Sequence, residues 1–278
     1  MNVNNDRSDQ VQICLFCHED SSLSKSVEHV LPESLGNTTM VLPPGIVCDN
    51  CNNYFARKIE APLLTSDSMI SLRYFENIPN KRGHTPSLHA SVKTSLGVPG
   101  ELHTWSEGPL RGVLSLPAPV SFEIFQNDNP FEIAIDGPDS IPRDATLGRF
   151  ICKIALESAA YRCYHNPLAY RSLLETDDWT GCRLHARYGT GPIWPVRVRR
   201  IYSPDRRWLD GSAKVQRVWE SDFLLTPTGQ LIFAIAIFGL EFTINCLEGD
   251  LAPYDAWLVR MHCPSLLYPD GLPAEPND

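Results

Sequence analysis

Cys14-Leu15-Phe16-Cys17, Glu28-His29-Val30-Leu31-Pro32 and Cys48-Asp49-Asn50-Cys51-Asn52 follow one another near the start of the chain. The two CxxC pairs supply four thiolates, the donor set of tetrahedral structural zinc. Within each pair, the two-residue gap lets a tight turn aim both sulfurs at one ion. The alternative is four unrelated buried cysteines, but the doubled spacing favours the metal. We therefore predict one zinc on Cys14, Cys17, Cys48 and Cys51.

Zinc held by four sulfurs has no open coordination position, so we expect it to be structural. Any chemistry then belongs to the polar residues around it. A histidine such as His29 is suited to take a proton from water. The Glu28 carboxylate and the Asn52 amide oxygen can together hold a hard divalent cation. A general base beside a Lewis acid fits phosphodiester hydrolysis.

The order CxxC, acidic residue-His-hydrophobic-x-Pro, CxxC-Asn resembles the zinc-stapled branch of the HNH endonucleases, over about residues 13–60. The resemblance implies a ββα-metal finger, in which a hairpin and one helix hold a catalytic Mg²⁺ or Mn²⁺ between them. It also implies that His29 is the general base and that Glu28 and Asn52 are cation ligands. The family usually has Asp in place of Glu28. The asparagine that braces its histidine loop has no match just before Cys48, and the nearest one is Asn37.

The composition places limits on the whole chain. It has 278 residues, a net charge of −9 and 43% hydrophobic residues, which predicts a globular protein. No apolar run reaches the length of a membrane span, and the polar start of the sequence predicts no signal peptide. Four of the nine cysteines follow a metal pattern, which favours a reducing, cytoplasmic location. We expect the other five to be reduced core residues.

We predict an α+β fold with two parts, a ββα-metal finger over 1–61 and a larger mixed domain over 62–278. In the larger part, short β-like runs at 88–92, 113–116, 120–125 and 131–135 predict antiparallel strands. Helical spacing of apolar residues over 144–166, with Asp144 as the N-cap, predicts a central helix. Residues 221–247 predict further strands around a Thr-Pro-Thr-Gly turn. We assign this second part to no family.

Charge divides unevenly along the chain. Residues 1–65 hold four Lys/Arg and eight Asp/Glu, whereas residues 183–217 hold nine Lys/Arg and two Asp, with aromatic residues interleaved. Arginine suits phosphate and aromatic rings stack on bases, so we predict nucleic-acid contacts for Arg197, Arg199 and Arg200. A strand hairpin with a solvated cationic face is an equal alternative. Arg57 and Lys58 lie beside the predicted site, where a phosphate contact competes with a simple solvated helix face.

Three functions remain open at this stage. The first is a metal-dependent endonuclease that hydrolyses DNA. The second is a zinc-ribbon module that binds nucleic acid without catalysis, but a plain ribbon needs neither the Glu28-His29 pair nor Asn52. The third is an effector, of the kind used in antiviral defence, whose second part responds to a protein partner, to nucleic acid or to a second copy of the chain.

Overall fold

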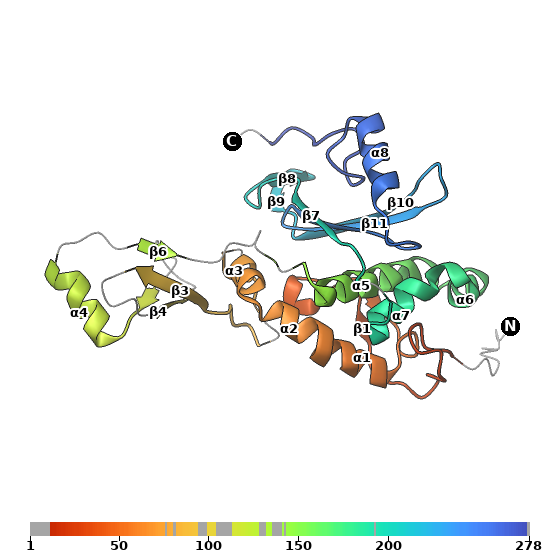
Figure 1. Ribbon diagram of the computed structural model, residues 1–278, viewed down its shortest axis with the longest axis horizontal. Helices are drawn as coiled ribbons and strands as arrows, with labels where there is room; N and C mark the ends of the chain where they lie inside the picture. The colour runs from red at the N-terminus through yellow and green to blue at the C-terminus, as the bar shows by residue number, and fades with distance from the viewer. Residues whose placement is uncertain are drawn as a thin grey trace.

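The computed structural model describes residues 12–75, 77–79, 82–93, 99–103, 113–127, 132–134, 141, 143–191 and 193–276. Figure 1 shows a helical and sheet-containing body with a separate small sheet extending to one side. Helices and antiparallel sheets occur together, so the predicted α+β class is confirmed.

The N-terminal part begins with a very short hairpin. Strand β1 (Glu28–His29) pairs antiparallel with β2 (Val41–Leu42), and the 3-10 turn η1 (Glu33–Leu35) lies between them. Helix α1 (Asp49–Phe55) follows and continues directly into the π-helical turn η2 (Ala56–Glu60) and α2 (Ala61–Leu64). The wider π-turn accommodates Pro62, whose ring removes one N–H from the helical ladder. A hairpin followed by a helix agrees with the ββα prediction.

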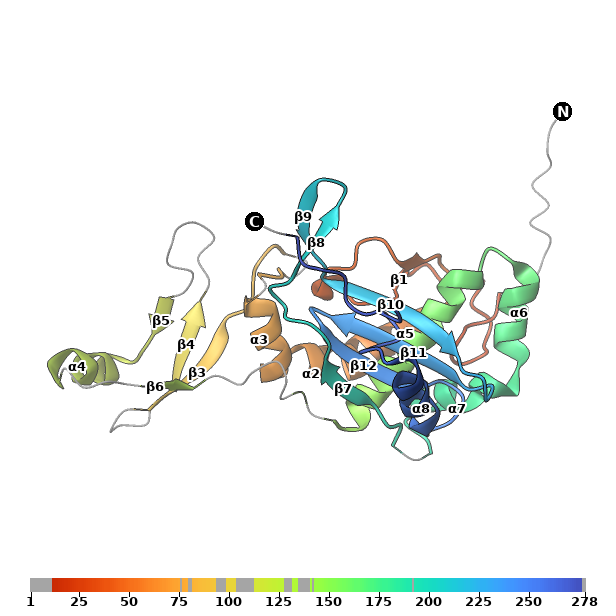
Figure 2. The same ribbon diagram turned by 90° about the horizontal axis from the view of Figure 1, so that it is seen from above.

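The small sheet extends from this body after helix α3 (Asp67–Phe75), as Figure 2 shows. It contains β3 (Leu88–Lys93), β4 (Pro99–His103), β5 (Val113–Ser115) and β6 (Glu132–Ala134), in the spatial order β5-β4-β3-β6. The strand predicted at 120–125 is wrong, because these residues belong to helix α4 (Ala118–Asn127). Pro117 and Pro119 explain the error: proline favours a helix start, and the Pro117 carbonyl accepts the N–H groups of Val120 and Ser121.

Helix α5 (Ala145–Cys163) is the central helix that the sequence predicts. Its N-cap, Asp144, accepts a hydrogen bond from the Leu147 N–H at 3.0 Å. Most of its residues are buried, because the N-terminal part covers one side, a sheet covers another, and further helices flank it. These are α6 (Pro167–Glu175), the 3-10 turn η4 (Asp177–Trp179) and α7 (Thr180–Tyr188).

The sheet above α5 has the order β10-β11-β12-β7 and is antiparallel throughout. Its strands are β7 (Arg197–Arg200), β10 (Trp219–Leu225), β11 (Leu231–Ile237) and β12 (Leu240–Asn245), and a separate hairpin joins β8 (Arg207–Asp210) to β9 (Ala213–Gln216). On β11, Phe233 and Ile235 belong to the core that includes α5, while Ile232 and Ala234 pack with helix α8 (Ala252–Met261). Alternate side chains point to opposite faces, so both faces of this strand are buried.

One core connects the N-terminal part with α5. Leu42, Phe55 and Ile59 of the N-terminal part lie in the same buried cluster as Phe150 and Ile154 of α5. The division at residue 61 falls inside the continuous helical run from α1 to α2 and stays a prediction. Within the described ranges, no helix is both long and apolar enough to cross a bilayer.

Candidate metal centre and active site

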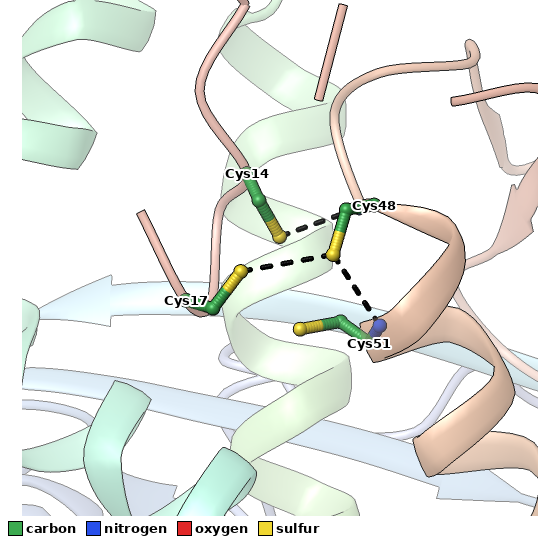
Figure 3. A group of neighbouring side chains, drawn as sticks. All are labelled: Cys14, Cys17, Cys48 and Cys51. Atoms are coloured by element: carbon green, nitrogen blue, oxygen red, sulfur yellow. Dashed lines mark hydrogen bonds between the residues drawn. The ribbon is translucent and has the colours of Figure 1, made fainter. Parts of the chain in front are cut away.

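The four predicted cysteines meet at the start of α1 (Figure 3). Their sulfur atoms all lie within 4.8 Å of one another, and Cys17 Sγ is 3.6 Å from Cys48 Sγ. Zn–S bonds of about 2.3 Å require sulfur–sulfur distances of about 3.8 Å in a tetrahedron. Backbone N–H groups support the sulfurs: Cys48 N–H donates to Cys14 Sγ at 3.3 Å, and Cys51 N–H donates to Cys48 Sγ at 3.4 Å. The donor set and its spacing therefore fit one structural zinc.

Close packing shifts the pKa values of Cys14, Cys17 and Cys51 in different directions. Hydrogen bonding with the Cys51 thiol lowers the pKa of Cys14 to about 4, and the same bond raises the pKa of Cys51. Burial raises the pKa of Cys17 to about 11. A divalent cation binds thiolates and neutralises their negative charge, so it favours the deprotonated form of these cysteines.

An arginine from the far part of the sequence completes the surroundings of the cysteines. Arg187 of α7 donates from Nε to Cys51 Sγ at 3.2 Å, and its guanidinium lies 4.0 Å from the centre of the Tyr54 ring. Arg149 of α5 fixes this arrangement by donating to the Arg187 carbonyl at 2.9 Å and to the Tyr54 hydroxyl. In the sequence, Arg187 is only one of the nine basic residues at 183–217, and no local pattern links it to the cysteines.

A hydrogen bond joins Asn52 to the residue before β1, the strand that carries Glu28 and His29. Asn52 follows Cys51 on α1, and its Nδ2 donates to the Val27 carbonyl at 3.0 Å, immediately before Glu28 and His29. This bond fixes the amide orientation and leaves Oδ1 as the atom able to face a cation. His29 is half-buried, and none of the described residues forms a hydrogen bond with its buried Nδ1 atom.

Asn37 holds the loop between β1 and β2. Its side chain is completely buried, and its Nδ2 donates to the Leu31 and Met40 carbonyls at 2.9 Å each. Its Oδ1 accepts the N–H groups of Thr39 at 3.1 Å and Met40 at 2.9 Å. These four bonds tie both ends of the loop that starts just after His29. Asn37 is thus the brace that the sequence pattern alone did not place.

Comparison with known families agrees with this geometry. Residues 14–68 match the family described as HNH endonuclease. They form an HNH segment. No curated protein and no solved structure matches the chain. The match indicates a nuclease-type function with metal binding, and it covers about a fifth of the sequence.

Glu28 of the HNH segment points into the protein. It is 6% exposed, and its Oε1 lies 2.7 Å from Nζ of the buried Lys153 on α5. Burial raises the pKa of the Glu28 carboxyl, although Lys153 acts in the opposite direction. Since Oε1 is bound to Lys153, a cation at the predicted site could use only the Oε2 atom of Glu28.

The predicted nucleic-acid contacts lie in two separate places. Arg57 and Lys58 are exposed on η2, within the HNH segment. The other three are on β7, where Arg197 pairs with Asp255, Arg199 donates to Glu241 at 2.7 Å, and Arg200 donates to the Phe238 carbonyl at 3.0 Å. Carboxylates therefore offset part of the positive charge on β7. A nucleic-acid role for these residues stays a prediction.

Proposed function

We propose that the protein is a metal-dependent HNH endonuclease that hydrolyses phosphodiester bonds in DNA. The observation that carries the proposal is the hydrogen bond from Asn52 to Val27. It joins the helix that follows the zinc cysteines to the strand that carries Glu28 and His29. The zinc cluster thereby sets the distance between the proposed base and the proposed cation ligands.

In the proposed mechanism, His29 accepts a proton from the attacking water. The water oxygen forms a bond to phosphorus, the bond from phosphorus to the 3′ oxygen breaks, and a solvent proton neutralises the leaving oxygen. Asn52 Oδ1 would hold Mg²⁺ or Mn²⁺ directly, and Glu28 Oε2, on the α5 side of β1, would bind the cation through a water. When bound, the cation supplies charge that stabilises the negative phosphoryl oxygens.

Other parts of the chain fit this proposal as contacts to DNA or to a partner. The exposed Arg57 and Lys58 can reach the phosphates that flank the cut, and β7 with Arg197, Arg199 and Arg200 offers a second surface. A cytoplasmic defence effector, triggered by a protein partner or by a second copy through residues 62–278, is the wider role that we propose. Its support is the attachment of a small HNH segment to a larger part.

A plasmid-nicking assay tests the proposed activity. Wild-type protein should convert supercoiled DNA to the nicked form with Mg²⁺ or Mn²⁺ and should stop when EDTA removes the cation. Asn52→Ala should nick slowly, and excess Mn²⁺ should partly restore its rate, because the lesion is weaker cation binding. Asn53→Ala, at the next and exposed position, is the matched control and should behave like wild type.

The assay also distinguishes the alternative. Binding of plasmid without cleavage under any of these cation conditions would reject the endonuclease. It would favour the non-catalytic zinc-ribbon module.

A further inference from the structure

Lys153 occupies an unusual position for a charged residue. It lies in the middle of α5, its side chain is 0% exposed, and its Nζ contacts three carboxylates. The distances are 2.7 Å to Glu28 Oε1, 2.9 Å to Glu60 Oε1 and 2.8 Å to Glu157 Oε2. We call these four residues the Lys153 cluster. It joins β1, η2 and α5, three elements that are far apart along the chain.

The charges in the Lys153 cluster do not balance, because one ammonium faces three carboxylates. Burial raises the pKa of Glu157 well above its ordinary value and also raises that of Glu28. Burial alone would lower the pKa of Lys153, but Glu157, Glu28 and Glu60 outweigh it and raise that pKa well above its ordinary value. Lys153 therefore stays charged.

Such a cluster is a poor source of stability. Taking several charges out of water costs about as much free energy as their attraction returns, and apolar replacements are often neutral or stabilising. A buried ion cluster is better explained by the geometry that it imposes. In this protein, the geometry concerns the strand that carries the proposed catalytic base.

Strand β1 has only two residues, and it pairs with β2 through Glu28–Leu42 and His29–Val41. A two-stranded hairpin of this size is not stable by itself. Neighbouring side chains of a strand point to opposite faces, so a Glu28 that is fixed toward α5 turns His29 away from α5. The buried Glu28 and the half-buried His29 agree with this arrangement.

We propose that Lys153 is a positioning residue for His29. Its ammonium holds Glu28, Glu28 holds β1, and β1 then presents the imidazole to the scissile phosphate. The inference rests on the proposed endonuclease function and extends it, because α5 lies outside the HNH segment. The larger part of the chain would thus contribute a residue that positions the proposed catalytic base.

The test compares two variants of the full-length protein. Lys153→Met removes the ammonium but leaves three buried carboxylates, which can prevent folding. The double variant Lys153→Met/Glu157→Met also removes the fully buried i,i+4 partner. Only Glu28 and the partly exposed Glu60 then lack the ammonium, so this variant should fold more readily than Lys153→Met. Arg162→Met, which removes an exposed cation from the same helix, is the control.

The proposal predicts the same result for each Lys153 variant that folds. Zinc content and the KM for plasmid should match wild type, while kcat should fall by about 10²-fold, the typical cost of a misplaced catalytic group. Hydrogen exchange at the Val30 amide, which bonds to the Met40 carbonyl, should become faster. Arg162→Met should change none of these quantities.

The outcomes separate this inference from the proposed function. Suppose that His29→Ala is inactive but the double variant keeps the wild-type kcat and unchanged Val30 exchange. This result would overturn the role of Lys153 and leave the proposed endonuclease function standing. Full activity of His29→Ala would instead reject the endonuclease. In that case, Val30 exchange still decides whether Lys153 fixes β1.

Discussion

Replacing Asn37 with alanine should strongly lower the free energy of unfolding, although Asn37 touches neither the proposed zinc nor the proposed base. The substitution removes two hydrogen bonds donated by Nδ2 and two accepted by Oδ1, all from a side chain that is 0% exposed. A net contribution of about 1 kcal/mol per bond gives an upper value of about 4 kcal/mol. Water entering the vacated space can satisfy part of the backbone, so we expect a loss of about 3 kcal/mol.

Urea unfolding at fixed free zinc measures this loss. Thr38→Ala, at the neighbouring and exposed position, is the control and should stay within about 0.5 kcal/mol of wild type. Asn37→Asp should be at least as harmful as Asn37→Ala, because a carboxylate would face the Leu31 and Met40 carbonyls without a donor. If both Asn37 variants unfold at the same urea concentration as Thr38→Ala, Asn37 does not brace the loop.

Three further predictions concern the metal and the buried charges. Cys48→Ser should release zinc and expose the amides of 12–60 to exchange while β11 stays protected, and loss of protection in both would contradict a boundary at 61. Arg187→Met should increase the rate of zinc transfer to a chelator, because the four cysteines lose the N–H that Arg187 donates to Cys51. An unchanged rate would show that Arg187 does not help to retain zinc. Glu157 has a raised pKa, so it favours folding when protonated, and its contribution falls as pH rises above 4.5 toward the raised pKa. As pH rises above 4.5, Glu157→Gln should therefore flatten the decline of unfolding free energy relative to wild type, and parallel curves would refute this sign.

Local sequence patterns predicted the parts of the fold that depend on local contacts. The CxxC pairs placed all four sulfurs because a short turn fixes each pair, and Asp144 marked the start of α5 because capping involves residues three apart. The strand predicted at 120–125 is wrong, because its apolar residues suit a strand while the prolines before it start a helix.

Contacts between distant segments could not be predicted in this way. Lys153 lies 125 residues from Glu28, and Arg187 lies 136 residues from Cys51, so only the packing of α5 and α7 against the HNH segment brings each pair together. The assignment of Asn37 as the brace stayed open for a different reason. The family pattern suggests a brace close to the second CxxC pair, whereas in this chain the brace lies inside the hairpin loop.

The plasmid-nicking rate of His29→Ala tests the central claim most directly. The protein should retain zinc, unfold at the wild-type urea concentration and bind plasmid, yet nick it about 10²–10⁴-fold more slowly, because proton transfer from water is lost. Neither Mg²⁺ nor Mn²⁺ should restore the rate, and His165→Ala, which removes an exposed histidine elsewhere, should cleave like wild type. Wild-type cleavage by His29→Ala, in protein free of contaminating nuclease, would contradict the account.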